Sequence, residues 1–269
     1  MQAHSLEPEN TSLGGPSMQA GHYEVRLAKS TTEIEAAQAL RYRVFYLENN
    51  GRASKEMIRL EREVDEWDKC AHHIIVLDHK ADNAVVGTLR LVSNNRLAHE
   101  QSFYTEKAFD LSKLRANYDR ILELSRYCIE PGGRSGTILL LIWKYAMKFI
   151  VDNHYQLMLG CASFPGLDVN QHKNNLMYLY QNNLAPEELR PVPIVSNSVD
   201  IAALHDETSD VEWDDKQKAV PTLLRGYLKL GARISDTAII DKQFNTVFVC
   251  IYVDAADMLL NNHTLVPKN

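Results

Sequence analysis

The middle of the chain contains a strand, a turn, a helix and a second strand in close succession, and this unit constrains the fold most. Residues 120–129 form an apolar segment typical of a strand, and residues 130–137 form a turn with three glycines. A helix is expected at residues 137–151 and another strand at residues 156–162. Two strands joined by a crossover helix lie parallel in one sheet. The unit therefore predicts an α/β or α+β fold, with a central mixed sheet flanked by helices.

The length and composition predict one large domain. The chain has 269 residues, of which 45% are hydrophobic, so it can bury a full core. We expect a disordered tail at residues 1–22, a single domain with an elaborated second half at residues 23–262, and a C-terminal tail at residues 263–269. The first of these segments lacks the apolar centre of a secretory signal, and Met18 is an alternative start.

Charge, hydropathy and cysteine usage argue against several classes of protein. The formal net charge of −6 and the pI near 5.9 disfavour a nucleic-acid-binding protein, whose affinity depends on neutralising phosphates. The apolar run at residues 138–143 is too short to span a bilayer. The cysteines Cys70, Cys128, Cys161 and Cys250 have no CxxC spacing, which favours buried thiols in a reducing cytosol and no metal site.

A helix is expected at residues 32–48, before the middle unit. Thr32 and Glu35 have the spacing of a capping box, which begins a helix by satisfying its free amides. Arg41 and Phe45 are four residues apart and therefore share one side of this helix.

Strands and loops are expected around this helix and after it. Residues 23–28 alternate as in a strand, and residues 73–78 and 84–92 are typical of a hairpin. An acidic loop is expected at residues 63–68. Residues 103–114 are compatible with a helix or a loop.

The second half of the chain is less regular. A helix is expected at residues 176–183, a loop with three prolines at residues 186–198, and a buried strand at residues 247–253. Residues 205–215 are strongly acidic and are expected to form solvated surface.

A further helix, expected at residues 223–233, would carry a basic stripe. Arg225, Lys229 and Arg233 follow one another at four-residue steps. An acidic carrier protein or an anionic lipid headgroup would suit such a stripe. An ordinary solvated helix face is the alternative.

Two sets of motifs resemble a known superfamily. Arg41…Val44-Phe45, Glu63…Asp65…Asp68, residues 87–91 and Glu123-Leu124-Ser125-Arg126 are similar to motifs of the acyl-homoserine-lactone synthases and their relatives. Residues 103–104 with 109–111, 159–164, 178–180 with 184–186, 226–232 and 241–246 are similar to those of the L-ornithine N-α-acyltransferases. The resemblance runs from about Tyr23 to Ala256 and places the chain beside the carrier-protein-dependent N-acyltransferases.

This resemblance implies a GNAT-like mixed sheet and a specific reaction. Such enzymes transfer a (3-hydroxy)fatty acyl group from acyl carrier protein to the α-amine of L-ornithine, giving lyso-ornithine lipid by direct attack on the thioester. The implied donor is the acyl-phosphopantetheine of the carrier, with no bound cofactor, and a downstream O-acyltransferase acts on the product. An amphipathic product implies a cytoplasmic enzyme with peripheral contact to the inner face of the membrane.

Two departures from the family pattern concern substrate binding. The homoserine-lactone synthases place a Trp soon after the first Phe, whereas residues 48–51 follow here, which disfavours that substrate. Before Arg134, a Pro-Gly-Gly turn replaces an Asp-aromatic pair. Arg134, Ser135, Gly136 and Thr137 are candidates for binding the pantetheine phosphate at a helix N-terminus, and a plain tight turn is the alternative.

Glu123 is the candidate general base, acting directly or through a water. An amino-acid α-amine has a pKa of about 8 or above, so much of it must lose a proton before it attacks. A carboxylate on a central strand is partly desolvated, which raises its pKa toward a useful value. A structural ion pair with Arg126 or Arg90 is the alternative.

The remaining charged motif residues are candidates for binding the acceptor. Asp65 and Asp68 would hold its ammonium groups and complete the catalytic set. Arg41, Arg90 and Arg126 would bind substrate, because a guanidinium fits a carboxylate bidentately. For each residue a structural or surface ion pair is the alternative.

Two aromatic side chains are candidates for the wall of the substrate cavity. Phe45 and Trp67 would line it, with plain core packing as the alternative.

Two other functions share these motifs. One is an N-acyltransferase for another acceptor, such as glycine or a homoserine derivative. The other is a non-catalytic module that binds an acyl carrier protein or a membrane surface. Buried charges without a use are expensive to keep, which disfavours the second.

Overall fold

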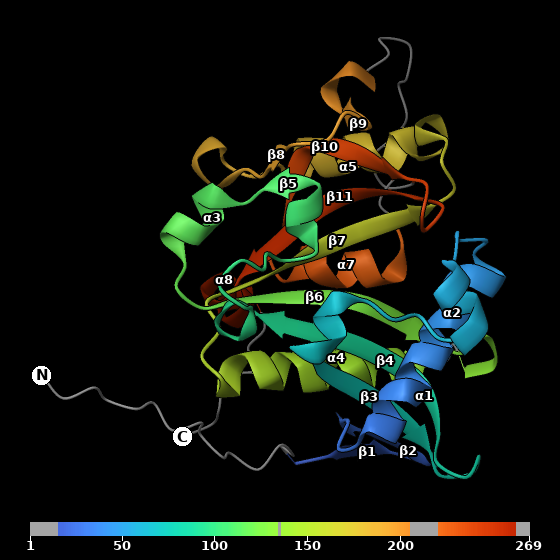
Figure 1. Ribbon diagram of the computed structural model, residues 1–269. Helices are drawn as coiled ribbons and strands as arrows, with labels where there is room; N and C mark the ends of the chain where they lie inside the picture. Colours follow the sequence, from blue (N-terminus) through green and yellow to red (C-terminus); the bar gives the residue numbers. More distant parts are fainter. Residues whose placement is uncertain (1–15, 134–135, 205–219, 262–269) are drawn as a thin grey trace, which may run out of the picture.

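The computed structural model describes residues 16–133, 136–204 and 220–261, and its centre is a nine-stranded mixed sheet (Figure 1). The strand order is β1-β2-β3-β4-β6-β7-β11-β10-β9. Neighbouring strands are antiparallel except β6 and β7, which are parallel. The predicted mixed sheet flanked by helices is confirmed.

The strands of the large sheet are β1 (Met18–Ala20), β2 (Tyr23–Leu27), β3 (His72–Asp78), β4 (Ala84–Ser93), β6 (Ile121–Ile129), β7 (Leu157–Pro165), β9 (Ser198–Asp200), β10 (Arg233–Asp241) and β11 (Thr246–Asp254). A small separate sheet pairs β5 (Phe109–Asp110) with β8 (Val192–Pro193). The α-helices are α1 (Thr31–Tyr42), α2 (Lys55–Leu60), α3 (Ser112–Asn117), α4 (Gly136–Asp152), α5 (Lys173–Asn183), α7 (Thr222–Lys229) and α8 (Ala255–Asn261). Short helical turns are η1 (Arg43–Glu48), η2 (Glu66–Lys69), η3 (Asn94–Arg96), η4 (Thr105–Lys107), η5 (Pro131–Gly133), η6 (Val169–His172), η7 (Glu187–Leu189) and η8 (Ala202–Leu204).

The two faces of the sheet are covered by different helices because strand side chains alternate between them. On β3, Ile75 and Leu77 pack with Leu40 of α1, whereas Ile74 and Val76 belong to the core under α4. Helix α7 lies on the α4 side, where Tyr227 packs edge-on against Trp143 at 4.6 Å between ring centroids. Figure 1 shows α1 and α4 on opposite faces of the strands.

The predicted crossover unit is present as β6, α4 and β7, and its two strands are paired along part of their length only. Residues 121–124 of β6 pair with residues 157–160 of β7, and Leu124 and Gly160 form the last pair. Beyond this point β6 continues along β4 and β7 continues along β11. A Cβ on Gly160 would lie 2.4 Å from the carbonyl oxygen of Leu124, so only glycine fits where the strands part.

The helix predicted at residues 223–233 is shorter than expected. Helix α7 ends at Lys229, and Gly231 then adopts a left-handed φ of 90°, which allows the chain to turn. Arg233 is therefore the first residue of β10, a strand that the sequence pattern did not predict. The expected basic stripe of Arg225, Lys229 and Arg233 on a single helix is wrong.

The N-terminal boundaries also differ from the prediction. Met18–Ala20 forms strand β1, which pairs with β2, so the segment expected to be a tail at residues 1–22 contains part of the sheet. The first helix is capped by Ser30, whose side chain accepts from the amide of Glu33 (3.2 Å), and not by Thr32. It changes to π-helical geometry at Arg43, so Phe45 lies in η1 and Arg41 in α1. The predicted C-terminal tail and the acidic segment at residues 205–215 lie outside the described residues.

Candidate active site

A cavity of about 340 Å³ lies where β6 and β7 part. Residues 124–127 of β6 and 158–165 of β7 contribute to its wall. Leu223, Leu224 and Tyr227 of α7 add an apolar surface. Pockets of this size and composition bind small molecules or parts of larger ones.

Aromatic side chains from distant parts of the chain complete the wall. Phe45 of η1, Tyr104 and Phe244 all line the cavity. Phe244 contacts Phe45 and Tyr104 edge-on, with ring centroids 5.7 and 6.5 Å apart. Phe45, predicted to line the substrate cavity, lies in the wall of this cavity, and its contact with substrate stays a prediction.

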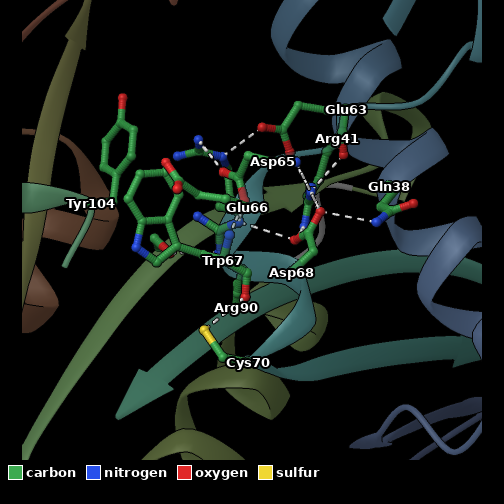
Figure 2. A network of polar contacts seen from close by, with 12 residues as sticks. Gln38, Arg41, Glu63, Asp65, Glu66, Trp67, Asp68, Cys70, Arg90 and Tyr104 are labelled. Carbon is green, nitrogen blue, oxygen red and sulfur yellow. Dashed lines mark hydrogen bonds and ion pairs between the residues drawn. The ribbon is translucent and has the colours of Figure 1, made fainter. Parts of the chain in front are cut away.

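Beside the cavity, three guanidinium groups and three carboxylates form a buried ion-pair cluster (Figure 2). Their formal charges cancel, which is how a protein keeps charged groups out of water at tolerable cost. The members of the ion-pair cluster are Arg41, Glu63, Asp65, Asp68, Arg90 and Arg126.

Asp68 is at the centre of the ion-pair cluster. Arg41 donates to both of its oxygens, from Nη1 at 2.9 Å and Nη2 at 2.8 Å, and Arg90 donates at 3.0 Å. Gln38 adds a hydrogen bond of 2.9 Å. Although burial alone would raise the pKa of Asp68, Arg41 and Arg90 hold it well below its usual value.

Asp65 is held in a similar way at the start of η2. Arg90 donates to Oδ1, and Arg126 donates to Oδ2 at 2.9 Å. Oδ1 also accepts from the amide of Trp67 at 3.0 Å. Neither Asp65 nor Asp68 lines the cavity.

Arg126 connects the ion-pair cluster to the cavity. Its Nε donates to Glu63 at 2.9 Å and its Nη2 to Asp65 at 2.9 Å, while the side chain also lines the cavity. The guanidinium packs against the rings of both Tyr104 and Phe244, 4.5 and 4.7 Å from their centroids. The residue has a left-handed φ of 57°, at a bulge where the register between β4 and β6 shifts. The bulge turns this side chain toward the ion-pair cluster.

Glu123 is fully buried and does not line the cavity. Its carboxylate accepts from the amide of Tyr104 (3.1 Å), and from the amide and the hydroxyl of Thr105 (both 2.7 Å). Burial raises the pKa of Glu123, and these hydrogen bonds oppose the rise. Thr105 does line the cavity, so the carboxylate reaches it through this hydroxyl.

Three of the predicted substrate-binding residues lie elsewhere than expected. Arg41 and Arg90 are fully buried in the ion-pair cluster and do not line the cavity. Trp67 is also absent from the cavity wall, since its Nε1 donates to the carbonyl of Ser102 (2.8 Å) and its ring packs against Tyr104. For Arg41 and Arg90 the geometry is that of the structural ion pair named above as the alternative.

Among the described residues, the candidates for contact with the carrier lie on three elements. Gly136 and Thr137 are exposed in the first turn of α4, whereas Arg134 and Ser135 lie outside the described residues. Arg225 and Lys229 are on α7, and Arg233 is on β10.

Sequence reasoning missed four residues that shape the site: Glu63 as an ion-pair partner, and Thr105, Asp241 and Phe244 in the cavity wall. Glu63 and the segment 241–246 belong to the motifs quoted above, but no role could be assigned to them. Thr105 stands 18 residues from Glu123 along the chain, and only the fold brings them together.

Comparison with known proteins first defines the class. Residues 40–144 match the family described as Acetyltransferase (GNAT) domain. An N-acyl amino acid synthase from uncultured soil microbes has a similar structure, with a TM-score of 0.51 and 9% sequence identity over 90% of this chain and 96% of that one. The fold is that of the GNAT acyltransferases.

Sequence relatives define the family more narrowly. The L-ornithine N(alpha)-acyltransferase of Rhodobacter capsulatus is 33% identical over 240 residues, which cover 88% of this chain and 91% of the relative. The protein of the same name from Agrobacterium fabrum is 32% identical over 246 residues, covering 88% and 83%. The chain belongs to the L-ornithine N(alpha)-acyltransferase family and is an N-acyltransferase. Within the described residues, no helix has both the length and the apolar character needed to cross a membrane.

Proposed function

We propose that the protein transfers a 3-hydroxy fatty acyl group from acyl carrier protein to the α-amine of L-ornithine, giving lyso-ornithine lipid. The observation that carries this proposal is the cavity between the parted strands, which joins an apolar wall to Arg126 and Thr105. The relatives named above support ornithine as the acceptor.

The donor thioester enters the gap between β6 and β7. Its acyl chain lies against the apolar side chains of α7 and β7, such as Leu224 and Met158. Past Leu124 and Gly160 the two strands no longer pair with each other, so backbone amides on these edges are suited to bind the oxygen of the tetrahedral intermediate.

The amine attacks the thioester directly, and the carrier thiolate leaves. A thiol has a pKa of about 8.5, so its thiolate is a good leaving group without acid assistance. Cys161 is in the cavity wall, but burial raises its pKa to about 12, so it is a poor nucleophile at neutral pH. No acyl-enzyme intermediate or bound cofactor is required.

Glu123 takes the proton of the amine through Thr105. As the α-ammonium loses its proton to Thr105 Oγ1, that hydroxyl passes its own proton to Glu123 Oε1, 2.7 Å away. The raised pKa of Glu123 suits a general base, because a proton acceptor works best when its pKa is near the working pH.

Arg126 binds the α-carboxylate of the acceptor. Its bonds to Glu63 and Asp65 use Nε and Nη2, and its guanidinium also has a side-chain hydrogen bond with Tyr104, which the acceptor carboxylate would replace at the cavity. In this proposal Asp65 and Asp68 act indirectly, by fixing Arg126 and Arg90, and they do not bind the ammonium groups themselves.

The chemistry of the product bears on where the enzyme works and on the next reaction. A single acyl chain on a charged amino acid is amphipathic, so peripheral contact of this enzyme with the inner face of the cytoplasmic membrane would aid release. The free 3-hydroxyl of the product is the substrate for an O-acyltransferase.

The test is a transfer assay with purified protein, 3-hydroxyacyl carrier protein and L-ornithine. We expect carrier thiol to be released only when ornithine is present, together with an amide product of the expected mass. Thiol release no higher than the background without enzyme would refute the proposal. Acylated coenzyme A in place of the carrier tests the donor.

The same assay separates the two alternative functions. Faster transfer to glycine or a homoserine derivative than to ornithine would change the acceptor and leave the chemistry intact. Binding of acylated carrier protein without transfer to any amino acid would indicate a non-catalytic module.

A further inference from the structure

The cavity wall contains two formally charged side chains among the described residues, and their charges are opposite. One is Arg126, discussed above, and the other is Asp241. The remaining lining residues are apolar or carry neutral polar groups. A cavity of this kind is suited to a ligand with one negative and one positive group.

Asp241 is held in place by the turn that it begins. It is the last residue of β10, and its Oδ1 accepts from the amides of Gln243 (2.8 Å) and Phe244 (3.1 Å). The turn is fixed in its own right, because the carbonyl of Gln243 accepts a hydrogen bond from the amide of Arg52 (2.7 Å). Within the described part of the chain, Oδ2 of Asp241 has no hydrogen-bond partner, so it can accept one from a ligand.

The carboxylate of Asp241 is near the groups assigned to the reaction. Burial is the largest cause of the raised pKa values of the Tyr104 phenol and the Cys161 thiol, two other groups of the cavity wall, and the negative charge of Asp241 adds to both. Cys161 Sγ is in turn 3.6 Å from Thr105 Oγ1. Asp241 and the proposed proton relay of Thr105 and Glu123 are therefore beside the same part of the cavity.

The α-amine of the acceptor is a poor partner for this carboxylate. That amine must be neutral when it attacks, and a neighbouring negative charge favours its protonated form. The side-chain ammonium of a diamino acid remains charged throughout the reaction, so a permanent ion pair with it costs no reactivity.

We propose that Asp241 binds the side-chain ammonium of the acceptor and thereby selects a basic diamino acid over a neutral one. This inference rests on the proposed function and adds a specificity residue to it. Arg126 at the α-carboxylate and Asp241 at the far ammonium hold the acceptor at both ends, with the α-amine directed to Thr105 and the thioester.

The test compares L-ornithine with L-norvaline, which is the same amino acid without the side-chain amine. The variant D241N keeps an oxygen that accepts from the amides of Gln243 and Phe244, and it removes only the charge. Losing one charge-assisted hydrogen bond should lower kcat/KM for ornithine roughly 10- to 100-fold, mainly through KM. Transfer to norvaline should stay within about twofold of the wild-type rate, so the ornithine preference of D241N should largely disappear.

The matched control is D236N, which changes another carboxylate on β10. Asp236 pairs with Arg190 at 3.6 Å and does not line the cavity. This variant should keep the wild-type preference for ornithine over norvaline.

Each contrary outcome identifies which claim fails. An unchanged preference in D241N, or equal use of both acceptors by the wild type, would overturn the role of Asp241 alone. Equal losses for ornithine and norvaline in D241N would assign the residue to the α-amine instead. No transfer to any amino acid would overturn the proposed function and this inference with it.

Discussion

Two buried carboxylates, Asp68 and Glu123, accept hydrogen bonds from different kinds of donor. The donors to Asp68 include charged guanidinium groups, and the donors to Glu123 are neutral. Asp68 accepts from two guanidinium groups, so its charged form is favoured and its pKa falls. Glu123 accepts from two amides and a hydroxyl, all neutral donors, and burial raises its pKa. The first carboxylate therefore stays ionised and supports the fold, whereas the second can exchange a proton near the cavity.

Removing the charge of Asp68 should destabilise the protein. In D68N, Arg41 and Arg90 lose a charged partner while they remain buried, and breaking such a pair typically costs about 3–5 kcal/mol. The control D152N breaks an exposed pair with Lys148 (2.7 Å), which should cost less than about 1 kcal/mol. Chemical denaturation at pH 7 measures both free energies of unfolding, and equal losses would contradict the structural role of Asp68.

The lowered pKa of Asp68 also predicts that the folded protein loses stability at acid pH. Because the folded-state pKa of Asp68 is lowered, its stabilisation is present above the pKa of an unfolded aspartate, about 3.9. This stabilisation is lost as the pH falls below that value toward the folded-state pKa. Between neutral pH and acid, the wild type should therefore lose more stability than D68N.

Glu123 and Thr105 should both be needed for the proton transfer, so that a change in either one lowers kcat by a similar factor. We expect E123Q to lower kcat roughly 10²- to 10³-fold, the usual contribution of a general base. T105V removes the relay hydroxyl but keeps the backbone amide that binds Glu123, so it should lose a similar factor, and T105S should recover most of it. Wild-type rates in T105V would show that the proton leaves by another route.

The pH profile gives an independent check on Glu123. Its folded-state pKa is raised, so the active, ionised form should appear only above the ordinary value of about 4.3. The logarithm of kcat/KM should rise with pH through this raised pKa in the wild type. This rise should be absent in E123Q. The same rise with pH in both proteins would show that another group titrates.

The sequence identified most of the charged residues that lie beside the cavity, but it misplaced several of them relative to the cavity wall. Arg126 and Phe45 line the cavity, but Arg41, Arg90, Asp65 and Asp68 are partners of one another. A motif shows which charged residues occur together. It does not show which of them neutralise each other and which face the substrate, because that depends on three-dimensional packing.

Among the elements, the partly paired strands β6 and β7 determine where the cavity lies. Their crossover helix and their parallel orientation follow from the sequence pattern alone. Their separation after Gly160 could not be predicted, because it depends on β4 and β11 as outer partners. Strand β10 was missed for a related reason, since the helical spacing of residues 223–233 continues through Gly231, where the chain turns.

Gly160 should tolerate no side chain. In G160A the new Cβ would meet the carbonyl oxygen of Leu124 at 2.4 Å, so the end of the β6–β7 pairing must shift. We expect a loss of stability of about 1–3 kcal/mol and a marked fall in activity, because the cavity begins at this pair. In the control G132A the new methyl group would have no atom within 4 Å, and both properties should stay near wild type. A stable and fully active G160A would contradict this role of Gly160.

In the whole molecule, the cavity is assembled from strands of the large sheet and from helical segments that are distant along the chain. Phe45 comes from η1, Arg126 from β6, Leu224 from α7, and Asp241 from the end of β10. The sequence predicted the mixed sheet, its crossover unit and the resemblance to N-acyltransferases. It could not predict that the β10–β11 turn closes the same cavity, since this contact joins residues almost 200 positions apart, such as Tyr46 and Gln243.

In the proposed complex, the thioester lies between β6 and β7 with its acyl chain against α7. An experimental structure with a stable amide analogue of 3-hydroxyacyl-pantetheine tests this claim most directly. We expect density for the amide beside Leu124 and Gly160, with the chain extending toward Leu224 and Tyr227. An analogue bound anywhere outside this gap, with the cavity left empty, would contradict it.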